Sequence, residues 1–472
     1  MFSRTILLTP RGGHFLFAAA LLTTLLVTPV TAQVVSSVSL RPFVTALIPV
    51  IGRNGAIGGV MVNAAGVVRR AESSDSASLR RAWSRARMPL PDELSRETGL
   101  RMVSLRRLEA TLTRHLKDKT PFPNEIMFLA GLHRVEYVFV VPDRRDIVLA
   151  GPADAWRLGA EAAMVAEGTK TPVLRLDDLM DALRTVEVAE TGPGISCSID
   201  PTREGLLQLK RLLSSRKLRL SAATIQRMRQ AVGDQQVTIT GVAPDSHFAR
   251  VMLAADFQMK TLAMDLQEAP VARFPSYLEL LGATSRQSPQ IAAPRWWLAA
   301  DYEPLLRSPD GRAWQLRGPG VQAMTEDGHL IEAGEIVAAT RKNHLAESWA
   351  NALSERYAEL GESLTAFAAL RNCMDLAVVA ALIAKEDMLT EAGCELPHLL
   401  SAAHIRGPRY NVPKTIESQV SLTRSSRGWF VSISGGVEID SWSVLRQVET
   451  SETLLPVRQA ALKSDSLNWW WD

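Results

Sequence analysis

The stretch VEYVFVVPDRRDIVLA, residues 135–150, is the clearest β signal in the chain and sets its fold class. Its two flanks, residues 135–141 and 147–150, are apolar and rich in β-branched and aromatic side chains, which favour strands. Between the flanks, Pro142 presets φ, and the aspartates at 143 and 146 offer oxygens for local hydrogen bonds. The stretch therefore predicts a β-hairpin.

Helical patterns lie on both sides of this hairpin. Helices are predicted at residues 104–117, 247–264 and 364–388, with a helix-rich region at 177–232. Either Asp245 or Ser246 can cap the helix that begins at residue 247. Strands mixed with runs of helices, without a regular βαβ alternation, predict an α+β fold. We expect short β-meanders and hairpins packed with helices in two or more subdomains, with one β-meander near the end of the chain at residues 414–424, 429–434 and 437–444.

Residues 1–32 have the pattern of a signal peptide. Arg4 and Arg11 precede an apolar run at residues 15–27, and Val30 and Ala32 provide small residues before a cleavage point at Gln33. We expect cleavage there and export of the mature chain. Retention as a membrane anchor is the alternative, although the run is shorter than the roughly 20 residues that span a bilayer.

The mature chain is long enough for two or three domains, since about 440 residues remain after cleavage. The predicted organisation is a signal peptide at residues 1–32, an N-terminal mixed region at 33–125, a central α+β domain at 126–270, a C-terminal α+β domain at 271–445 and a tryptophan-containing tail at 446–472. The tail ends in three adjacent indoles, Trp469 to Trp471, which cannot all be buried in one regular element. It docks on the body, is disordered, or binds a partner or a membrane interface.

The charge balance argues against nucleic acid as a partner. The chain has 53 basic and 50 acidic residues, and loss of Arg4 and Arg11 with the leader leaves a mature net charge of +1. Such a balance creates no long-range field for nucleic acid or anionic lipid. The longest later apolar run, residues 376–384, predicts a core helix, so no transmembrane segment is expected after signal cleavage.

The cysteines and histidines indicate neither a disulfide framework nor a metal site. Cys197, Cys373 and Cys394 are too few for a disulfide scaffold, and a predicted helix separates the last two, so we expect free, buried thiols. The chain has no HxxxH, HExxH or CxxC spacing, and its glycines do not form a phosphate loop. We therefore predict no metal and no cofactor.

One enzyme hypothesis rests on a thiol. Cys197 lies in the segment GISCSIDPT, between a Gly-Pro-Gly turn and the start of a helix, where its pKa could be lowered. His247 would then be the base and Asp245 would orient its ring, as in a cofactor-free hydrolase. The alternative is a small buried cysteine in a strand, with Asp200 or Thr202 capping the next helix.

Two further sets of residues are candidates for binding. Asp256 and Lys260 are four residues apart on the helix at 247–264, so they either line a cleft or form an exposed salt bridge. Aromatic and arginine side chains gather on a hairpin predicted at residues 295–317, where they either bind a sugar or peptide or pack in the interior. The candidates there are Arg295, Trp296, Tyr302 and Trp314, and Trp296 and Trp297 must face opposite sides of a strand.

Several phrases resemble one family in order along residues 50–445. They are FLAGL at 128–132, YVFV at 137–140, DIVLAGP at 146–152, SCSIDPT at 196–202, AADFQMK at 254–260, PRWW at 294–297, RNCMDL at 371–376 and SGGVEIDSW at 434–442. Together they resemble the large planctomycete family of exported proteins that is defined by a domain of unknown function. The resemblance implies an exported bacterial protein of the cell envelope and carries no assigned activity or site residues.

The sequence therefore favours an exported, non-catalytic envelope or periplasmic protein, either structural or a binding module, with an unknown envelope partner or ligand. The alternatives are the hydrolase built on Cys197 and His247 and a carbohydrate- or peptide-binding module built on the 295–317 hairpin.

Overall fold

The predicted hairpin is present in the computed structural model, where β4 (Tyr137–Val141) and β5 (Asp146–Ala153) pair antiparallel. The short helix η3 (Pro142–Arg144) makes the turn between them. The structure describes residues 55–72, 74–75, 90–159, 161, 163–192, 194–213, 221–284, 290–292, 294–330, 336–338, 343–418, 420–422, 429–432, 434–463 and 471. The predicted signal peptide, residues 1–32, lies outside these residues.

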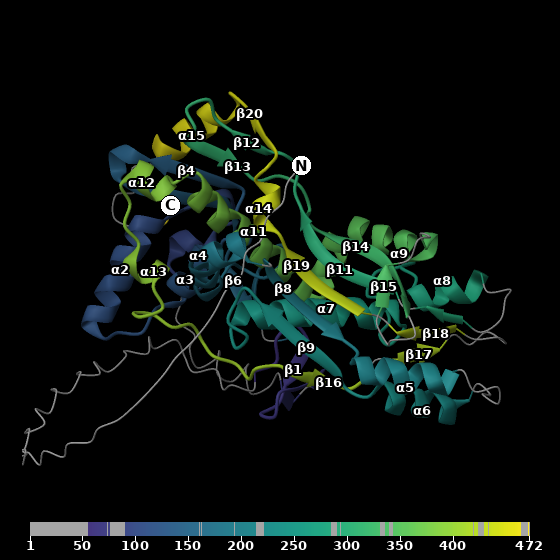
Figure 1. Ribbon diagram of the computed structural model, residues 1–472. Helices are drawn as coiled ribbons and strands as arrows, with labels where there is room; N and C mark the ends of the chain where they lie inside the picture. The colour runs from purple at the N-terminus through teal and green to yellow at the C-terminus, as the bar shows by residue number, and fades with distance from the viewer. Residues whose placement is uncertain are drawn as a thin grey trace, which may run out of the picture. The chain divides into compact units, whose positions relative to one another are not determined.

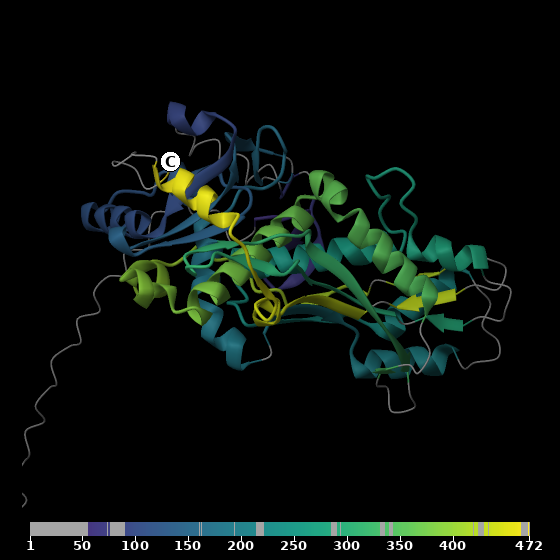
Figure 2. The same cartoon turned by 90° about the horizontal axis from the view of Figure 1, so that it is seen from above.

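The hairpin lies within a sheet that has six strands in the described part of the chain, with β5 next to the edge strand (Figure 1). In order across the sheet they are β20 (Val448–Thr450), β12 (Leu305–Arg307), β13 (Ala313–Gln315), β4, β5 and β3 (Thr98–Ser104). Neighbours pair antiparallel except β12 and β20. Phe139 and Val148 pack with residues of α15 (Leu454–Lys463), the yellow helix that crosses the blue strands in Figure 2.

A larger sheet has nine strands among the described residues, and it draws them from most of the chain. In order they are β1 (Val60–Val62), β2 (Val67–Arg70), β16 (Thr415–Ile416), β9 (Gln235–Thr240), β8 (Ile195–Asp200), β19 (Ser434–Ile439), β11 (Pro294–Asp301), β14 (Gly320–Leu330) and β15 (Ile336–Ala338). The pairs β2–β16 and β11–β19 are parallel and the others antiparallel. The predicted regions 33–125, 126–270 and 271–445 therefore share one sheet, and the described elements fall within one compact unit, residues 43–472.

Two smaller sheets complete the described β-structure. One is β10 (Gln290–Ala292), β18 (Trp429–Ser432) and β17 (Val420–Leu422), and the other is β6 (Trp156–Leu158) with β7 (Met164–Ala166). The predicted meander at the end of the chain is thus divided, because β16 and β19 join the large sheet while β17 and β18 pair with each other.

The centre of the large sheet depends on the adjacent glycines 435 and 436 of β19, and a Cβ at Gly436 would lie 1.8 Å from the backbone oxygen of Cys197. Gly435 in β19 has a φ of 112°, and a Cβ at this position would lie 1.8 Å from the backbone oxygen of Trp296. No other residue type fits both this conformation and this close approach of β19 to β11.

Helices pack on these sheets. They are α2 (Leu105–Asp118), α3 (Asn124–Met127), α4 (Leu176–Thr191), α5 (Arg203–Leu213), α6 (Ala222–Val232), α7 (His247–Ala263), α8 (Tyr277–Thr284), α9 (His344–Glu355), α10 (Tyr357–Ser363), α11 (Thr365–Lys385), α12 (Met388–Ala392), α13 (Pro397–Leu400), α14 (Ser441–Val444) and α15. With the strands they confirm the predicted α+β class. Figure 2 shows the green helices of residues 344–385 running along the large sheet.

Helix α7 is the centre of the core. It packs against β8 and β19 of the large sheet and also against α4 and α11. Because partners surround it, α7 is buried along its length, whereas the sequence placed Asp256 and Lys260 either in a cleft or in an exposed salt bridge. Ser246 caps it, as one of the two predicted capping residues, and accepts a hydrogen bond from the Ala249 amide at 3.1 Å.

Helix α11 is, among the described residues, the one helix long and apolar enough to cross a membrane. Of its most apolar 18-residue window, 89% is buried inside the protein. That burial agrees with the predicted core helix at residues 376–384.

The last described residue, Trp471, docks on the body. Its side chain is buried and its backbone bridges to Val103 in β3. Trp469 and Trp470 lie outside the described residues.

Candidate functional site

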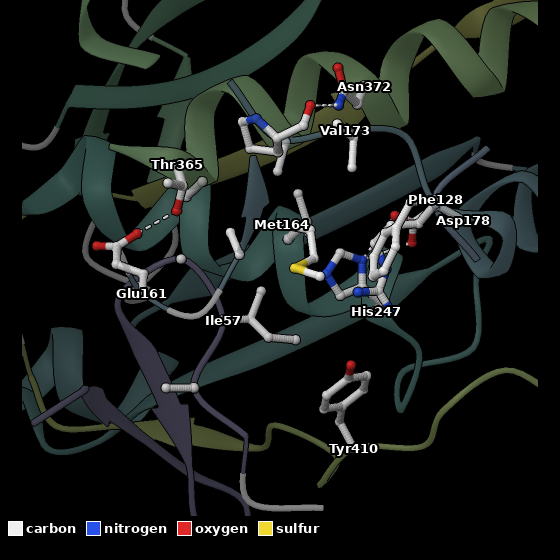
Figure 3. A pocket seen from close by; sticks show the side chains of 18 residues that line it. Ile57, Phe128, Glu161, Met164, Val173, Asp178, His247, Thr365, Asn372 and Tyr410 are labelled. Atoms are coloured by element: carbon white, nitrogen blue, oxygen red, sulfur yellow. Dashed lines mark hydrogen bonds and ion pairs between the residues drawn. The ribbon is translucent and has the colours of Figure 1, made fainter. Parts of the chain in front are cut away.

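A cavity lies where α4, α7 and α11 meet the segments at residues 56–58 and 161–175 (Figure 3). Its volume is about 50 Å³, counted as the room open to the centres of water-sized molecules. The lining residues are Ala56, Ile57, Gly58, Phe128, Glu161, Ala163, Met164, Pro172, Val173, Arg175, Asp178, His247, Val251, Thr365, Ala366, Ala369, Asn372 and Tyr410. The walls are thus largely apolar, with a few polar groups at opposite ends, as is usual for small-ligand sites.

One end of the cavity holds a carboxylate–imidazole pair. Asp178, in the first turn of α4, accepts from Nδ1 of His247, the first residue of α7, with distances of 3.0 and 2.9 Å to its two oxygens. Both oxygens of Asp178 are acceptors, so Nδ1 carries a proton, and in the neutral tautomer that this hydrogen bond selects Nε2 is an acceptor. Among the described residues Nε2 has no hydrogen-bond partner, so it is available to a ligand.

A second carboxylate beside this pair is already neutralised. Asp177 accepts from Nε of Arg175 at 2.9 Å and from Nη2 of Arg175 at 2.8 Å. Burial pushes the pKa of Asp177 upward, but the charge and hydrogen bonds of Arg175 outweigh it and hold that pKa below its usual range. This two-point bond fixes Arg175 at the cavity wall.

Tyr410 faces the same end of the cavity. Figure 3 shows its hydroxyl directed toward His247, and the ring centroids of the two residues are 6.2 Å apart. Burial, with the carboxylates of Asp177 and Asp178, raises the pKa of Tyr410 to about 12, so the hydroxyl stays protonated and can donate. It has no hydrogen-bond partner among the described residues.

A buried arginine lies behind Tyr410. Arg250 is 0% exposed, and its guanidinium carbon lies 6.0 Å from the centroid of the Tyr410 ring. Its Nη2 donates to the Val60 oxygen at 3.2 Å, whereas Nε and Nη1 lack partners. Burial lowers the pKa of Arg250 to about 10, which leaves it charged at pH 7.

The opposite end of the cavity is closed by a second polar pair. Thr365, the first residue of α11, donates to Glu161, and Figure 3 shows this pair well separated from His247. Burial raises the pKa of Glu161 above its usual range. Ile57 and Met164 lie between the two ends.

Asp177, Asp178 and His247 also have the spacing of a metal site, because one ligand atom from each lies within 4.8 Å of the others. The donor set fits a cation poorly, since Arg175 occupies both oxygens of Asp177 and adds a positive charge. Both oxygens of Asp178 also already accept from His247. Hydrogen bonds and ion pairs within the cluster thus already use the oxygens that a metal ion would need.

The structure separates the predicted thiol hydrolase residues. Cys197 is 1% exposed within β8 and does not line the cavity, and burial, with the carboxylates of Asp256 and Asp200, raises its pKa well above the usual value. His247 is bonded to Asp178, and Asp245 accepts from Arg409 at 2.6 Å. The arrangement corrects the hydrolase hypothesis, which required Cys197 to be exposed beside His247. Cys373 and Cys394 are also free and buried, as predicted.

Asp256 and Lys260 form a buried pair, so neither sequence interpretation holds. Their side chains are 0% and 1% exposed, with Nζ of Lys260 2.9 Å from Oδ2 of Asp256. The same Nζ donates to the Ile199 oxygen at 2.7 Å and to the Gly435 oxygen at 3.0 Å. The pair therefore attaches α7 to β8 and β19 and is structural.

The structure also corrects the aromatic binding face. Within the hairpin predicted at residues 295–317, only β12 and β13 pair with each other. Strand β11 belongs to the large sheet, so Trp296 and Trp314 lie in different sheets. Trp296 is 0% exposed, with ring centroids of Tyr277 and Trp349 at 4.8 and 4.6 Å.

The other residues of the predicted binding face also interact with neighbouring residues of the protein. Trp314 is 1% exposed and donates to the Gly311 oxygen, and the Tyr302 hydroxyl donates to Asp375 at 2.6 Å. Arg295 is exposed and stacks on Trp297, on the side of β11 opposite to Trp296, as the predicted alternation requires. Trp296, Trp314 and Tyr302 therefore pack in the interior, which is the alternative that the sequence offered to a binding surface.

Sequence reasoning identified His247 but not its partners. Asp178 and Tyr410 are 69 residues before and 163 residues after it, and Asp177 and Asp178 read as ordinary acidic residues in the first turn of a helix. One signal was available: Asp178 and Asp181, three apart, put two carboxylates on the same side of a largely apolar helix.

Comparison with known proteins gives one match. A family model described as a protein of unknown function (DUF1598) matches residues 197–277, which run from β8 through α7 to the start of α8. This segment, which includes His247, is thus a domain of unknown function. No curated protein and no solved structure matched the chain.

Proposed function

We propose that this protein is an exported envelope or periplasmic protein that binds a small molecule in the cavity beside His247. The observation that carries the binding role is the pair of polar atoms, His247 Nε2 and the Tyr410 hydroxyl, that line the cavity without partners among the described residues. Leaving such groups unpaired is unfavourable unless water or a ligand satisfies them. The leader pattern of residues 1–32 supports the export role.

The chemistry of the cavity narrows the ligand. Nε2 of His247 accepts a hydrogen bond and the Tyr410 hydroxyl donates one, so a hydroxyl or primary amide group satisfies both. Ile57, Met164 and Val251 provide apolar contacts for a short aliphatic part. A volume of about 50 Å³ admits a group of a few non-hydrogen atoms rather than a large cofactor.

Ligand binding can be tested with fragments that carry one hydroxyl or amide group, monitored by NMR of the purified mature protein. We expect binding to be lost in His247→Gln and weakened in Tyr410→Phe, with no change in the control His344→Gln, whose side chain is 88% exposed. Fragments that bind all three variants equally would place the site elsewhere.

Export is tested separately by fractionating cells that produce the full chain and sequencing the N-terminus of the product. We expect a periplasmic or envelope protein that begins at Gln33. A full-length product in the cytoplasm would overturn the export proposal and leave the binding proposal standing.

The Asp178–His247 pair favours a second candidate function, general-base hydrolysis. The carboxylate orients the ring so that Nε2 can take a proton from a water molecule, whose oxygen adds to an ester carbon. The same proton then goes to the departing alcohol, so no cofactor is needed. A rate of p-nitrophenyl acetate hydrolysis that falls about 100-fold in Asp178→Asn would support general-base hydrolysis. If the protein hydrolyses this ester no faster than the background, only the binding role remains.

A further inference from the structure

A second cavity, of about 430 Å³, is lined by residues 168–171, which directly precede the Pro172 and Val173 of the first cavity. We call it the basic groove. Its charged side chains are Arg134, Lys170, Arg371 and Glu362, with His133 beside them. The groove thus has three positive side chains and one negative one, whereas the mature chain as a whole has a net charge close to zero.

Arg371 is the central cation of the groove. It lies on α11 and forms neither an ion pair nor a hydrogen bond with the described residues, and its Nε is buried without a partner. Buried guanidinium donors are normally paired, because an unsatisfied charged donor is costly. An anion in the groove would supply the missing partner.

Glu362 is the acid of the groove, and among the described residues no ion pair joins it to Arg371. Arg134 is paired with Asp375, at 3.3 Å, and donates to the Gly318 oxygen at 2.8 Å, so its charge is balanced. His133 adds no competing charge, because burial and then the nearby Arg371 lower its pKa to about 4 and the ring is neutral at pH 7. A neutral imidazole can still donate one hydrogen bond.

The outer wall of the groove supplies further donors. Lys170 is exposed and its ammonium group has no partner among the described residues. Thr169 and Thr171 bring hydroxyl groups that lie 2.7 Å apart. Two free cations and several neutral donors match a group with two negative charges and several acceptor oxygens, which is the chemistry of phosphate.

We infer that the basic groove is a phosphate-binding site, anchored by Arg371 and Lys170, for inorganic phosphate or a phosphate monoester. Arg371 offers the planar fork that binds an oxyanion at two points, and Lys170 offers a mobile point charge at the rim. The site does not depend on the proposed function, because no residue of the Asp178–His247 pair lines the groove.

Calorimetric titration of the mature protein at low ionic strength tests this inference, with inorganic phosphate and glycerol 3-phosphate as probes and acetate as the comparison anion. We expect saturable binding of both phosphates that weakens at least about tenfold in Arg371→Gln, which corresponds to about 1.4 kcal/mol. Arg371→Lys keeps the positive charge but loses the planar guanidinium fork, so its affinity for phosphate should lie between those of the wild type and Arg371→Gln.

The controls separate a specific site from general charge. Lys170→Gln changes an exposed residue and should weaken binding severalfold without affecting the fold, whereas Arg295→Gln and His247→Gln should leave it unchanged. Cosedimentation with vesicles containing phosphatidic acid, lost in Arg371→Gln, would identify a lipid headgroup as the phosphate source; binding of soluble phosphates alone would identify a free ligand. No saturable phosphate binding, equal binding of acetate, or equal losses in Arg295→Gln would overturn the inference.

Discussion

Replacing Lys260 with methionine should destabilise the protein strongly, because it leaves Asp256 buried without a counter-charge. Methionine preserves the length of the side chain, and the change removes three contacts of Nζ: to the Ile199 oxygen at 2.7 Å, to Asp256 at 2.9 Å and to the Gly435 oxygen at 3.0 Å. Breaking a buried pair by removing one partner costs about 3–5 kcal/mol. We expect a loss in this range, since Asp256 is 0% exposed.

The pH dependence of the loss follows from Asp256. Burial raises its pKa to about 7 even with Lys260 opposing the rise, so the pKa in Lys260→Met should be higher still. A raised pKa means that the folded state holds a proton that the unfolded state releases above about pH 4. The free energy of unfolding is then highest at low pH and falls as pH rises. Between pH 5 and 9 it should fall further in Lys260→Met than in the wild type.

Urea unfolding followed by circular dichroism at several pH values measures both effects, with the double variant Asp256→Asn/Lys260→Met completing the cycle. The double variant should be at least about 2 kcal/mol more stable than the sum of the single losses predicts. Arg295→Met is the matched control, because it breaks an ion pair with Glu326 whose members are 52% and 48% exposed and should cost under about 1 kcal/mol. A loss in Lys260→Met no larger than in this control would refute the reasoning.

Three further predictions concern single positions. Gly435→Ala should prevent folding or cost more than about 3 kcal/mol in urea unfolding, because its Cβ would meet the Trp296 oxygen at 1.8 Å; a mild effect would contradict the strand geometry. Asp181→Asn should stabilise the protein by about 2–4 kcal/mol at pH 8 and by less near pH 5, since burial and the adjacent carboxylates raise the pKa of Asp181 to about 7; a gain that does not grow with pH would exclude this cause. The thiols of Cys197 and Cys373 should react with a disulfide reagent after unfolding and not before, because burial shields them and raises the pKa of each well above the usual value.

The elements that local pattern defines were predictable. The hairpin at residues 135–150 forms because runs of β-branched and aromatic side chains and a proline turn act over a few residues, and it became β4 and β5. The helix at 247–264 became α7 with the predicted cap at Ser246. In both, the interactions that decide the structure are close in sequence.

Strand order was not predictable in this way. β8 lies between β9 and β19, so residues 195–200 pair with a strand about 40 residues later and with another almost 240 residues later. Such pairings are selected by packing on α7 and by the close approach of β19 to Cys197 of β8 that Gly436 permits, neither of which leaves a local pattern. The predicted meander at the chain end failed for this reason.

The burial of polar residues on α7 shows the same limit. Arg250, Asp256 and Lys260 interrupt an apolar helix, which normally marks the exposed side of a surface helix. In the structure Arg250 donates to the Val60 oxygen in β1, and Lys260 donates to the Ile199 oxygen in β8 and the Gly435 oxygen in β19, while Asp256 is paired with Lys260 itself. Spacing alone could not show that these backbone oxygens come within reach.

Helix α11 shows why a correct prediction of structure can still conceal function. Its apolar run correctly indicated a core helix, yet two of its polar residues line the two cavities. Asn372 faces the cavity of His247 and donates to the Pro172 oxygen at 2.7 Å, while the preceding residue, Arg371, lines the basic groove. Adjacent helical residues point about 100° apart, so one turn of a buried helix can serve two sites on different sides. The few polar residues of a core helix therefore deserve the first mutations, because apolar packing does not account for them.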